Sequence, residues 1–155
     1  MVQEDKELLL KDLGARLDTN LVCSIYRTDD EGVGYRDEVL HGYCKGDIWY
    51  EFYFREDCSI GIDDVSKIKP YLFPLSSMTE DQLYEIKEIT EFKYNHNTLE
   101  LVKWTETHTT LEFWLEEVPQ YSVIEVFDWL NKNHFDYRCL IEKGLAIDAT
   151  GLNIY

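Results

Sequence analysis

The chain has 155 residues, of which 45% are hydrophobic and 14% aromatic, and its formal net charge is −16. This length suits a single domain, and the apolar content excludes an intrinsically disordered acidic chain. Binding to phosphate backbones or to anionic membranes requires clustered Lys and Arg, so the charge argues against nucleic acid and membrane as partners.

The sequence pattern of residues 1–70 predicts one helix followed by short strands. An apolar stripe with helical spacing predicts a helix over residues 4–17, with charged residues on its other face; the stripe consists of Leu8, Leu9, Leu10, Leu13 and Leu17. β-Branched and aromatic runs predict strands over 21–27, 38–45, 48–54 and 58–62, separated by a loop over 28–34 and a turn at 46–47. A helix with such strands fits an SH3-like or Sm-like barrel, or a plain antiparallel sheet with the helix across one face.

Residues 71–155 predict helices on either side of a hairpin. Pro70 and Pro74 bracket an extended connection, because the residue before a proline disfavours helix. Thr79 and Gln82 form a capping box that starts a helix over 80–90. The remaining predicted elements are a hairpin of strands 91–104 and 107–116, a helix from the capping box Ser122-x-x-Glu125 to Asn133, and a short last helix capped by Asp136 and ended by Gly144. The prediction is one α+β domain over 1–155 with mostly antiparallel pairing.

The negative charge is concentrated in the middle of the chain. Residues 1–69 contain 16 acidic and 9 basic residues, residues 70–131 contain 12 and 3, and residues 132–155 contain 3 and 3. The net charges of these segments are therefore −7, −9 and zero. The central helix and hairpin are the most acidic part of the chain, whereas the last segment is neutral and apolar.

The termini and cysteines indicate a compartment. The acidic start of the chain lacks the basic flank and apolar core of a secretory signal, and no apolar run reaches the length of a membrane span. The four cysteines form no C-x-x-C pair; they are Cys23, Cys44, Cys58 and Cys139. We therefore expect a cytoplasmic protein with reduced thiols.

Two segments resemble a known family. They are KPYLFPLSSMTE at 69–80 and DWLNKNHFDYRCLIEKGLA at 128–146. With the Leu-Leu-Lys-Asp-Leu run of the first helix they cover roughly a third of the chain, and they resemble small proteins of phages and mobile elements of gut anaerobes. That family has arginine and glycine at the positions of Phe73 and Cys139, and residues from about 91 to 120 resemble an insertion. The resemblance implies a phage or prophage setting and carries no activity or catalytic residue.

Two His-x-Thr tripeptides are the sharpest candidate for catalysis. His96 with Thr98 and His108 with Thr110 resemble the paired motifs of two-histidine phosphoesterases, in which one histidine acts as base and the other as acid. Those enzymes separate the motifs by most of a lobe, whereas here both fall in one predicted hairpin. They share a face only if the hairpin register is even, and we favour the simpler interpretation that they are ordinary residues of a solvated strand face.

Other polar clusters give weaker signals. His41 and Cys44 lie three apart in a predicted strand, which places their side chains on opposite faces and makes a metal site with Cys58 poor. The acidic runs at 29–31 and 63–64 lack the alternating spacing of a calcium loop and fit solvated turns. We predict no metal and no cofactor. His134, Asp136 and Arg138 could hold a ligand, or could form a corner in which Asp136 is a cap and Arg138 pairs with an acid.

The aromatic residues suggest either a core or a binding platform. Trp49, Tyr50, Phe52, Tyr53 and Phe54 alternate over both faces of one predicted strand. Trp104 and Trp114 flank the predicted hairpin turn and could be interface anchors, since tryptophan is favoured there. An acidic rim around such anchors suits a basic partner, and the residues predicted to form it are Glu85, Glu88, Glu112 and Glu116.

Three functions are compatible with this sequence. The first is an acidic module that binds a basic, nucleic-acid-binding host protein, for example as an anti-defence inhibitor. The second is a binder or phosphoesterase of nucleotides or cyclic nucleotides that uses the His-x-Thr pair. The third is an accessory domain whose acidity serves solubility alone.

Overall fold

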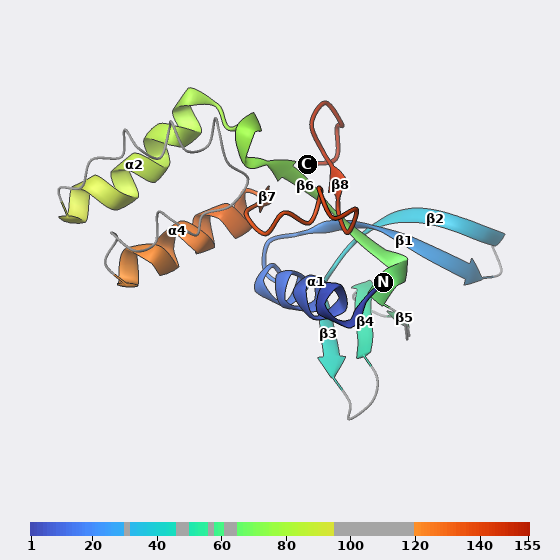
Figure 1. Cartoon of the computed structure of the whole chain (residues 1–155). Helices are drawn as coiled ribbons and strands as arrows, with labels where there is room; N and C mark the ends of the chain where they lie inside the picture. The colour runs from blue at the N-terminus through green and yellow to red at the C-terminus, as the bar shows by residue number, and fades with distance from the viewer. Residues whose placement is uncertain (30–31, 46–49, 56–57, 61–64, 95–119) are drawn as a thin grey trace.

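The computed structural model describes residues 1–29, 32–45, 50–55, 58–60, 65–94 and 120–155 (Figure 1). Its helices are α1 (Gln3–Ala15), α2 (Glu80–Tyr94) and α4 (Gln120–Lys132), with short 3-10 helices η1 (Val65–Lys67) and η2 (Leu75–Ser77). Its strands are β1 (Val22–Asp29), β2 (Gly32–Val39), β3 (Gly42–Lys45), β4 (Tyr50–Arg55), β5 (Cys58–Ile60), β6 (Ile68–Pro74), β7 (Phe135–Asp136) and β8 (Ile147–Asp148). None of these helices is both long and apolar enough to cross a bilayer.

The strands form two sheets that one bent segment connects. The first sheet has the order β2-β1-β6-β7, with β8 also paired to β6, and the second has the order β3-β4-β5. β7 and β8 run parallel to β6, whereas the other described pairs are antiparallel. Only Leu40 and His41 separate β2 from β3, so the chain passes directly from one sheet to the other. The predicted α+β class is confirmed.

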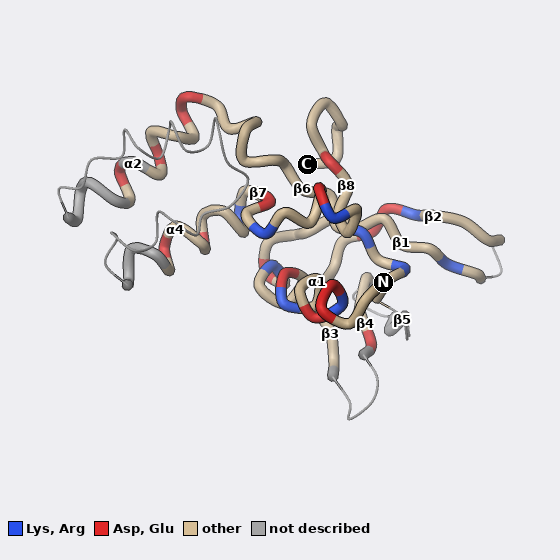
Figure 2. The backbone as a smooth tube through the Cα atoms, in the orientation of Figure 1, with Lys and Arg blue, Asp and Glu red and all other residues tan. Residues whose placement is uncertain are grey.

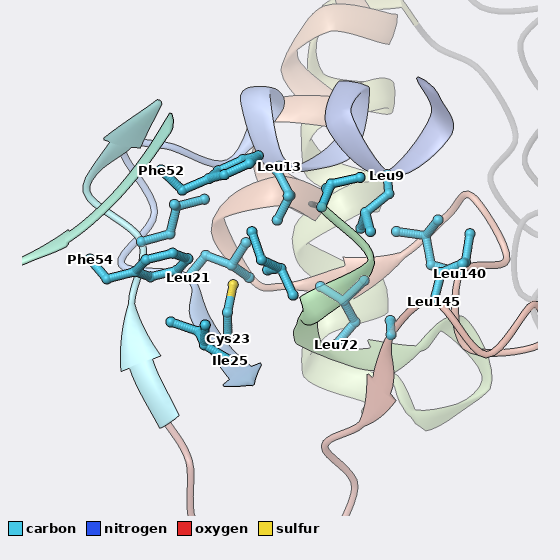
Figure 3. Close-up of a cluster of buried hydrophobic side chains, with 14 residues drawn as sticks. Leu9, Leu13, Leu21, Cys23, Ile25, Phe52, Phe54, Leu72, Leu140 and Leu145 are labelled. Carbon is cyan, nitrogen blue, oxygen red and sulfur yellow. The ribbon is translucent and has the colours of Figure 1, made fainter. Parts of the chain in front are cut away.

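The first core cluster joins α1 to both sheets and to the end of the chain. Leu9 and Leu13 of α1 are fully buried against strand residues that include Ile25 and Leu72. Figure 3 shows Leu140 and Leu145, which come from the C-terminal segment, completing the same cluster. Residues more than 120 positions apart in the sequence therefore share one core.

The second core cluster lies between α2 and α4. Ile86 of α2 faces Val126 and Leu130 of α4, and all three are almost fully buried. Leu75, Phe135 and Tyr137 close the base of this cluster, where the two helices meet β6 and β7. In Figure 1 the helix pair extends from the sheets on the side opposite to the β1–β2 hairpin.

Several predictions for the N-terminal half need correction. The expected loop over 28–34 is shorter, because β1 continues to Asp29 and β2 begins at Gly32. The single strand expected over 38–45 is two strands in different sheets, since the chain bends at Leu40 and His41. The connection between Pro70 and Pro74 is extended as expected, yet it belongs to β6. Proline has no N–H to donate to a neighbouring strand. Pro70 is tolerated in β6 because on the side away from β1 the pairing with β7 and β8 begins only after it.

The expected boundaries of the later helices also differ. The Thr79 capping box is confirmed, with the amide of Thr79 donating to Gln82 Oε1 (2.9 Å) and the amide of Gln82 donating to Thr79 Oγ1 (3.3 Å). α2 then continues to Tyr94, so residues 91–94 are helical rather than a strand. α4 already begins at Gln120, which places Ser122 inside the helix and not at its cap. The rest of the expected hairpin lies outside the described residues.

The last predicted helix is absent from the structure. Residues 135–136 form β7, and the following segment makes one helical turn in which the amide of Lys143 donates to the carbonyl of Cys139 (3.2 Å). Gly144 has φ +69° and ends this turn in a Schellman arrangement, as predicted for a C′ glycine. Cys139 has φ +58°. A left-handed residue immediately before the turn prevents a helix from starting earlier.

We expect the left-handed conformation of Cys139 to be unfavourable, because its Cβ is close to the next carbonyl oxygen. Cys139→Gly should therefore raise the free energy of unfolding by about 1 kcal/mol, and Cys139→Val should lower it by at least as much. Chemical denaturation of both variants measures this difference. A less stable glycine variant together with an unaffected valine variant would contradict the assignment of strain.

Candidate functional site

A buried ion pair joins α1 to the segment that follows α4. Asp12 and Arg16 have no exposed surface, and the guanidinium donates through Nε to Asp12 Oδ2 (2.8 Å) and through Nη2 to Asp12 Oδ1 (3.1 Å). Nη2 also donates to the carbonyl of Phe135 (2.7 Å), and Nη1 donates to the carbonyl of Asn131 (3.4 Å). The side chain of Arg16, which directly follows α1, thus binds two backbone carbonyls that lie 115 and 119 residues later in the sequence.

The sequence prediction placed the charged residues of α1 on its solvent face, and this is wrong for Asp12 and Arg16. They lie four residues apart, in phase with Leu9 and Leu13, so Asp12 shares the leucine face of α1 and Arg16 follows the same side at the C-cap of the helix. That spacing is the signal that could have revealed a buried pair. The residues that complete the pair, 131 and 135, could not have been found from local sequence.

Arg138 pairs with an acid, as the structural interpretation of this corner predicted. Its Nη1 lies 3.6 Å from Asp12 Oδ1, and its guanidinium lies 4.7 Å from the centroid of the Tyr137 ring. Arg16 approaches the same ring at 5.4 Å. The Tyr137 hydroxyl donates to Asn131 Oδ1 (2.9 Å), which joins this ring to the same polar cluster. We call Asp12, Arg16, Asn131, Tyr137 and Arg138 the arginine cluster.

Asp136 acts as a cap for the turn after β7. Its carboxylate accepts the amides of Arg138 (3.3 Å), Leu140 (3.0 Å) and Ile141 (2.8 Å). Burial raises the pKa of this carboxyl, and the three amide hydrogen bonds oppose that rise. These contacts use the carboxylate to shape the backbone.

His134 is buried beside the last residue of the chain. It has φ +58°, its ring stacks on Tyr155 with 3.9 Å between ring centroids, and its Nδ1 has no hydrogen-bond partner among the described residues. The Tyr155 hydroxyl donates to the carbonyl of Tyr71 (2.7 Å). Burial, and secondarily the charge of Arg16, lower the pKa of His134 to about 4.

A small pocket lies beside this corner. It has a volume of about 190 Å³, and its lining residues are Pro74, Leu75, Ser76, Asp136, Cys139, Ile141 and Glu142. Of the three residues predicted to hold a ligand, only Asp136 reaches it, while His134 and Arg138 are engaged elsewhere. Among the described residues no group of His, Cys, Asp and Glu could hold a metal ion.

The outward face of α2 carries an acidic stripe. Asp81, Tyr84, Glu85 and Glu88 are all exposed and recur at helical spacing on one face. Figure 2 shows acidic residues spaced along this helix. Glu85 also contacts α4: its Oε2 accepts the indole Nε1–H of Trp129 (2.9 Å), and the Trp129 ring stacks on Phe135 (5.6 Å between ring centroids). We call these four residues of α2 the acidic stripe.

Of the predicted interaction residues, Glu85 and Glu88 therefore share one exposed face. Trp104, Glu112, Trp114 and Glu116 lie outside the described residues, as do His96, Thr98, His108 and Thr110 of the catalytic alternative. Phe52 and Phe54 are buried in the first core cluster, which favours packing over a binding platform for that strand. Sequence reasoning missed the exposed cross-strand pair Tyr26 and Tyr35, because the expected loop included the start of β2.

Comparison of the chain with known protein families, with curated proteins and with solved structures gave no match. The resemblance to phage proteins accordingly stays a prediction.

Protonation of His134 should make stability depend on pH. Its pKa of about 4 lies below the unfolded value of 6.5, so between these values the unfolded chain binds a proton that the folded chain does not. Stability should therefore fall as the pH drops from about 6.5 to 4 and show no contribution from this group above 6.5. The full shift corresponds to about 3 kcal/mol, which solvent screening reduces to about 2 kcal/mol.

His134→Asn is the matched control, since asparagine tolerates the left-handed backbone and does not titrate. Denaturation of both proteins across this pH range measures the difference. The same loss of stability in the asparagine variant would assign the pH dependence to other groups.

Proposed function

We propose that this chain is an acidic protein-interaction module of phage or prophage type that acts in the cytoplasm. Its partner in this proposal is a basic, nucleic-acid-binding host protein, and blocking such a protein's nucleic-acid surface would make the chain an anti-defence inhibitor. The acidic stripe of α2 carries the proposal, because it is the described helix face on which exposed acids accompany an exposed tyrosine.

The construction of the stripe supports this proposal over solubility alone. α2 is fixed on α4 by the second core cluster and by the bond between Glu85 and Trp129. A carboxylate held in place keeps its geometry when a partner approaches, which favours a specific encounter, whereas acids that only solubilise need no fixed position. Tyr84 is 63% exposed within the stripe and could provide an aromatic anchor.

The sheet arrangement supports a finer proposal about the fold. β1 pairs with both β2 and β6, and the bent β2–β3 segment leads into β4 and β5, with η1 immediately before β6. A strand that bends from one sheet into another is how a small barrel turns its corners. We propose on this basis that α1 and residues 22–74 form an SH3-like or Sm-like barrel.

The stripe can be tested with purified nucleases and other basic nucleic-acid-binding proteins of the host. Asp81→Asn with Glu88→Gln should lower the association rate several-fold, because opposite charges accelerate encounter, and raising the salt from 50 to 200 mM should reduce the difference. The control Glu4→Gln with Glu142→Gln changes the net charge equally at exposed positions elsewhere.

Stopped-flow or surface-based kinetics measure these rates. If the two double variants lowered the association rate equally, the stripe would act only through the net charge of the protein. That result would support the solubility interpretation. Undetectable binding of the wild-type chain at low salt to all of these proteins would contradict the proposed function itself.

A further inference from the structure

The outer edge of β2 is a sheet edge that no described strand covers. β2 stands at the end of the strand order β2-β1-β6-β7, and no other strand in the described part of the chain pairs with it along this edge. Figure 1 shows the β1–β2 hairpin extending away from the helices and from the second sheet. Its eight cross-strand pairs follow one register without a bulge.

The register identifies which backbone groups point outward. The amide of Leu40 donates to the carbonyl of Leu21 (2.8 Å), which makes this a hydrogen-bonded pair of the β1–β2 ladder. Bonded and non-bonded pairs alternate in an antiparallel ladder. The N–H and C=O groups of Val33, Tyr35 and Asp37 therefore point away from β1.

This edge lacks two devices that usually prevent another strand from pairing, a proline and a bulge, although it carries charged residues at Arg36, Asp37 and Glu38. Residues 32–39 contain no lysine and no proline, and the strand has no bulge. Val33 and Tyr35 are 65% and 67% exposed, and Tyr35 makes an edge-to-face contact with Tyr26 at 5.1 Å. A Cβ built at Gly34 meets nothing within 4 Å, so packing among the described residues does not require glycine there.

The charge of the hairpin indicates what would pair with this edge. Residues 27–39 contain five acidic and two basic residues. Asp37 is exposed and is held by the Tyr71 hydroxyl, which donates to its Oδ1 (2.9 Å). Tyr35 and Asp37 lie two residues apart in β2, so their side chains lie on the same face. An arginine on an added strand could therefore pair with Asp37 and stack on Tyr35. A second copy of the chain would instead bring two acidic hairpins together.

We propose that the outer edge of β2 accepts an extended basic segment of the partner as an additional strand. Main-chain hydrogen bonds to residues 33, 35 and 37 would supply affinity, and the face formed by Val33, Tyr35 and Asp37 would select alternating basic side chains. This inference rests on the proposed function for the basic character of the partner, but it uses a surface on the other side of the molecule from the acidic stripe.

The test uses a fluorescent eight-residue peptide of alternating arginine and valine, titrated with the full chain and followed by anisotropy. A block peptide with four arginines followed by four valines is the matched control. Tyr35→Pro removes an outward N–H and leaves the hydrogen bonds between β1 and β2 in place. Tyr35→Ala removes the same side chain but keeps this N–H. We expect the alternating peptide to bind at least tenfold more weakly to Tyr35→Pro and two- to fivefold more weakly to Tyr35→Ala, with the block peptide weaker throughout.

Circular dichroism of both variants checks that the hairpin is folded. Equal binding to wild type and Tyr35→Pro, or no binding to wild type, would overturn the inference. Sedimentation of the wild-type chain as a dimer that Tyr35→Pro abolishes would also overturn it, because the occupant would then be a second copy. Loss of peptide binding in the Asp81→Asn, Glu88→Gln variant alone would place the peptide on α2 and leave the proposed function standing.

Discussion

The buried guanidinium of Arg16 is the interaction on which the arrangement of this molecule depends. It neutralises Asp12 within α1 and donates to the carbonyls of residues 131 and 135, so it connects the first helix to the segment between the two core clusters. A buried arginine is tolerated only when its donors are matched, and here a carboxylate and two carbonyls match them. Replacing such a cluster with apolar side chains can be neutral for stability, whereas removing one member leaves a buried charge unpaired.

The arginine cluster links the elements that carry the two surfaces we propose for binding. On one side, residue 135 contributes to the base of the α2–α4 pair, which presents the acidic stripe. On the other side, Leu140 and Leu145 return to the core under β1, which carries the hairpin with its open edge. A partner with a basic surface and an extended basic segment could contact both, and two modest contacts on one rigid body give an affinity greater than either alone.

Local sequence patterns predicted the elements better than their connections. The stripe of leucines located α1, and the capping box at Thr79 located the start of α2 to the residue, because both signals act within one or two helical turns. The burial of Asp12 and Arg16 depends on carbonyl groups more than 110 residues away, and no local pattern contains that information. The absent last helix has a local cause instead: the side chain of Asp136 and the left-handed Cys139 shape a turn whose sequence is otherwise helical. For the candidate site, the sequence predicted two residues of the acidic stripe, Glu85 and Glu88, but it did not predict the exposed pair Tyr26 and Tyr35.

The most direct test of this account is the stability of Arg16→Met compared with Arg138→Met. Both substitutions remove one guanidinium near Asp12, but Arg16 is fully buried, whereas the side chain of Arg138 is 17% exposed and 3.6 Å from the carboxylate. Denaturation should show that Arg16→Met lowers the free energy of unfolding by about 3–5 kcal/mol and Arg138→Met by about 1 kcal/mol. Hydrogen exchange should show lost protection at the amides of residues 145 and 149 in the first variant only. Equal, small effects of the two substitutions would contradict the central place given to Arg16.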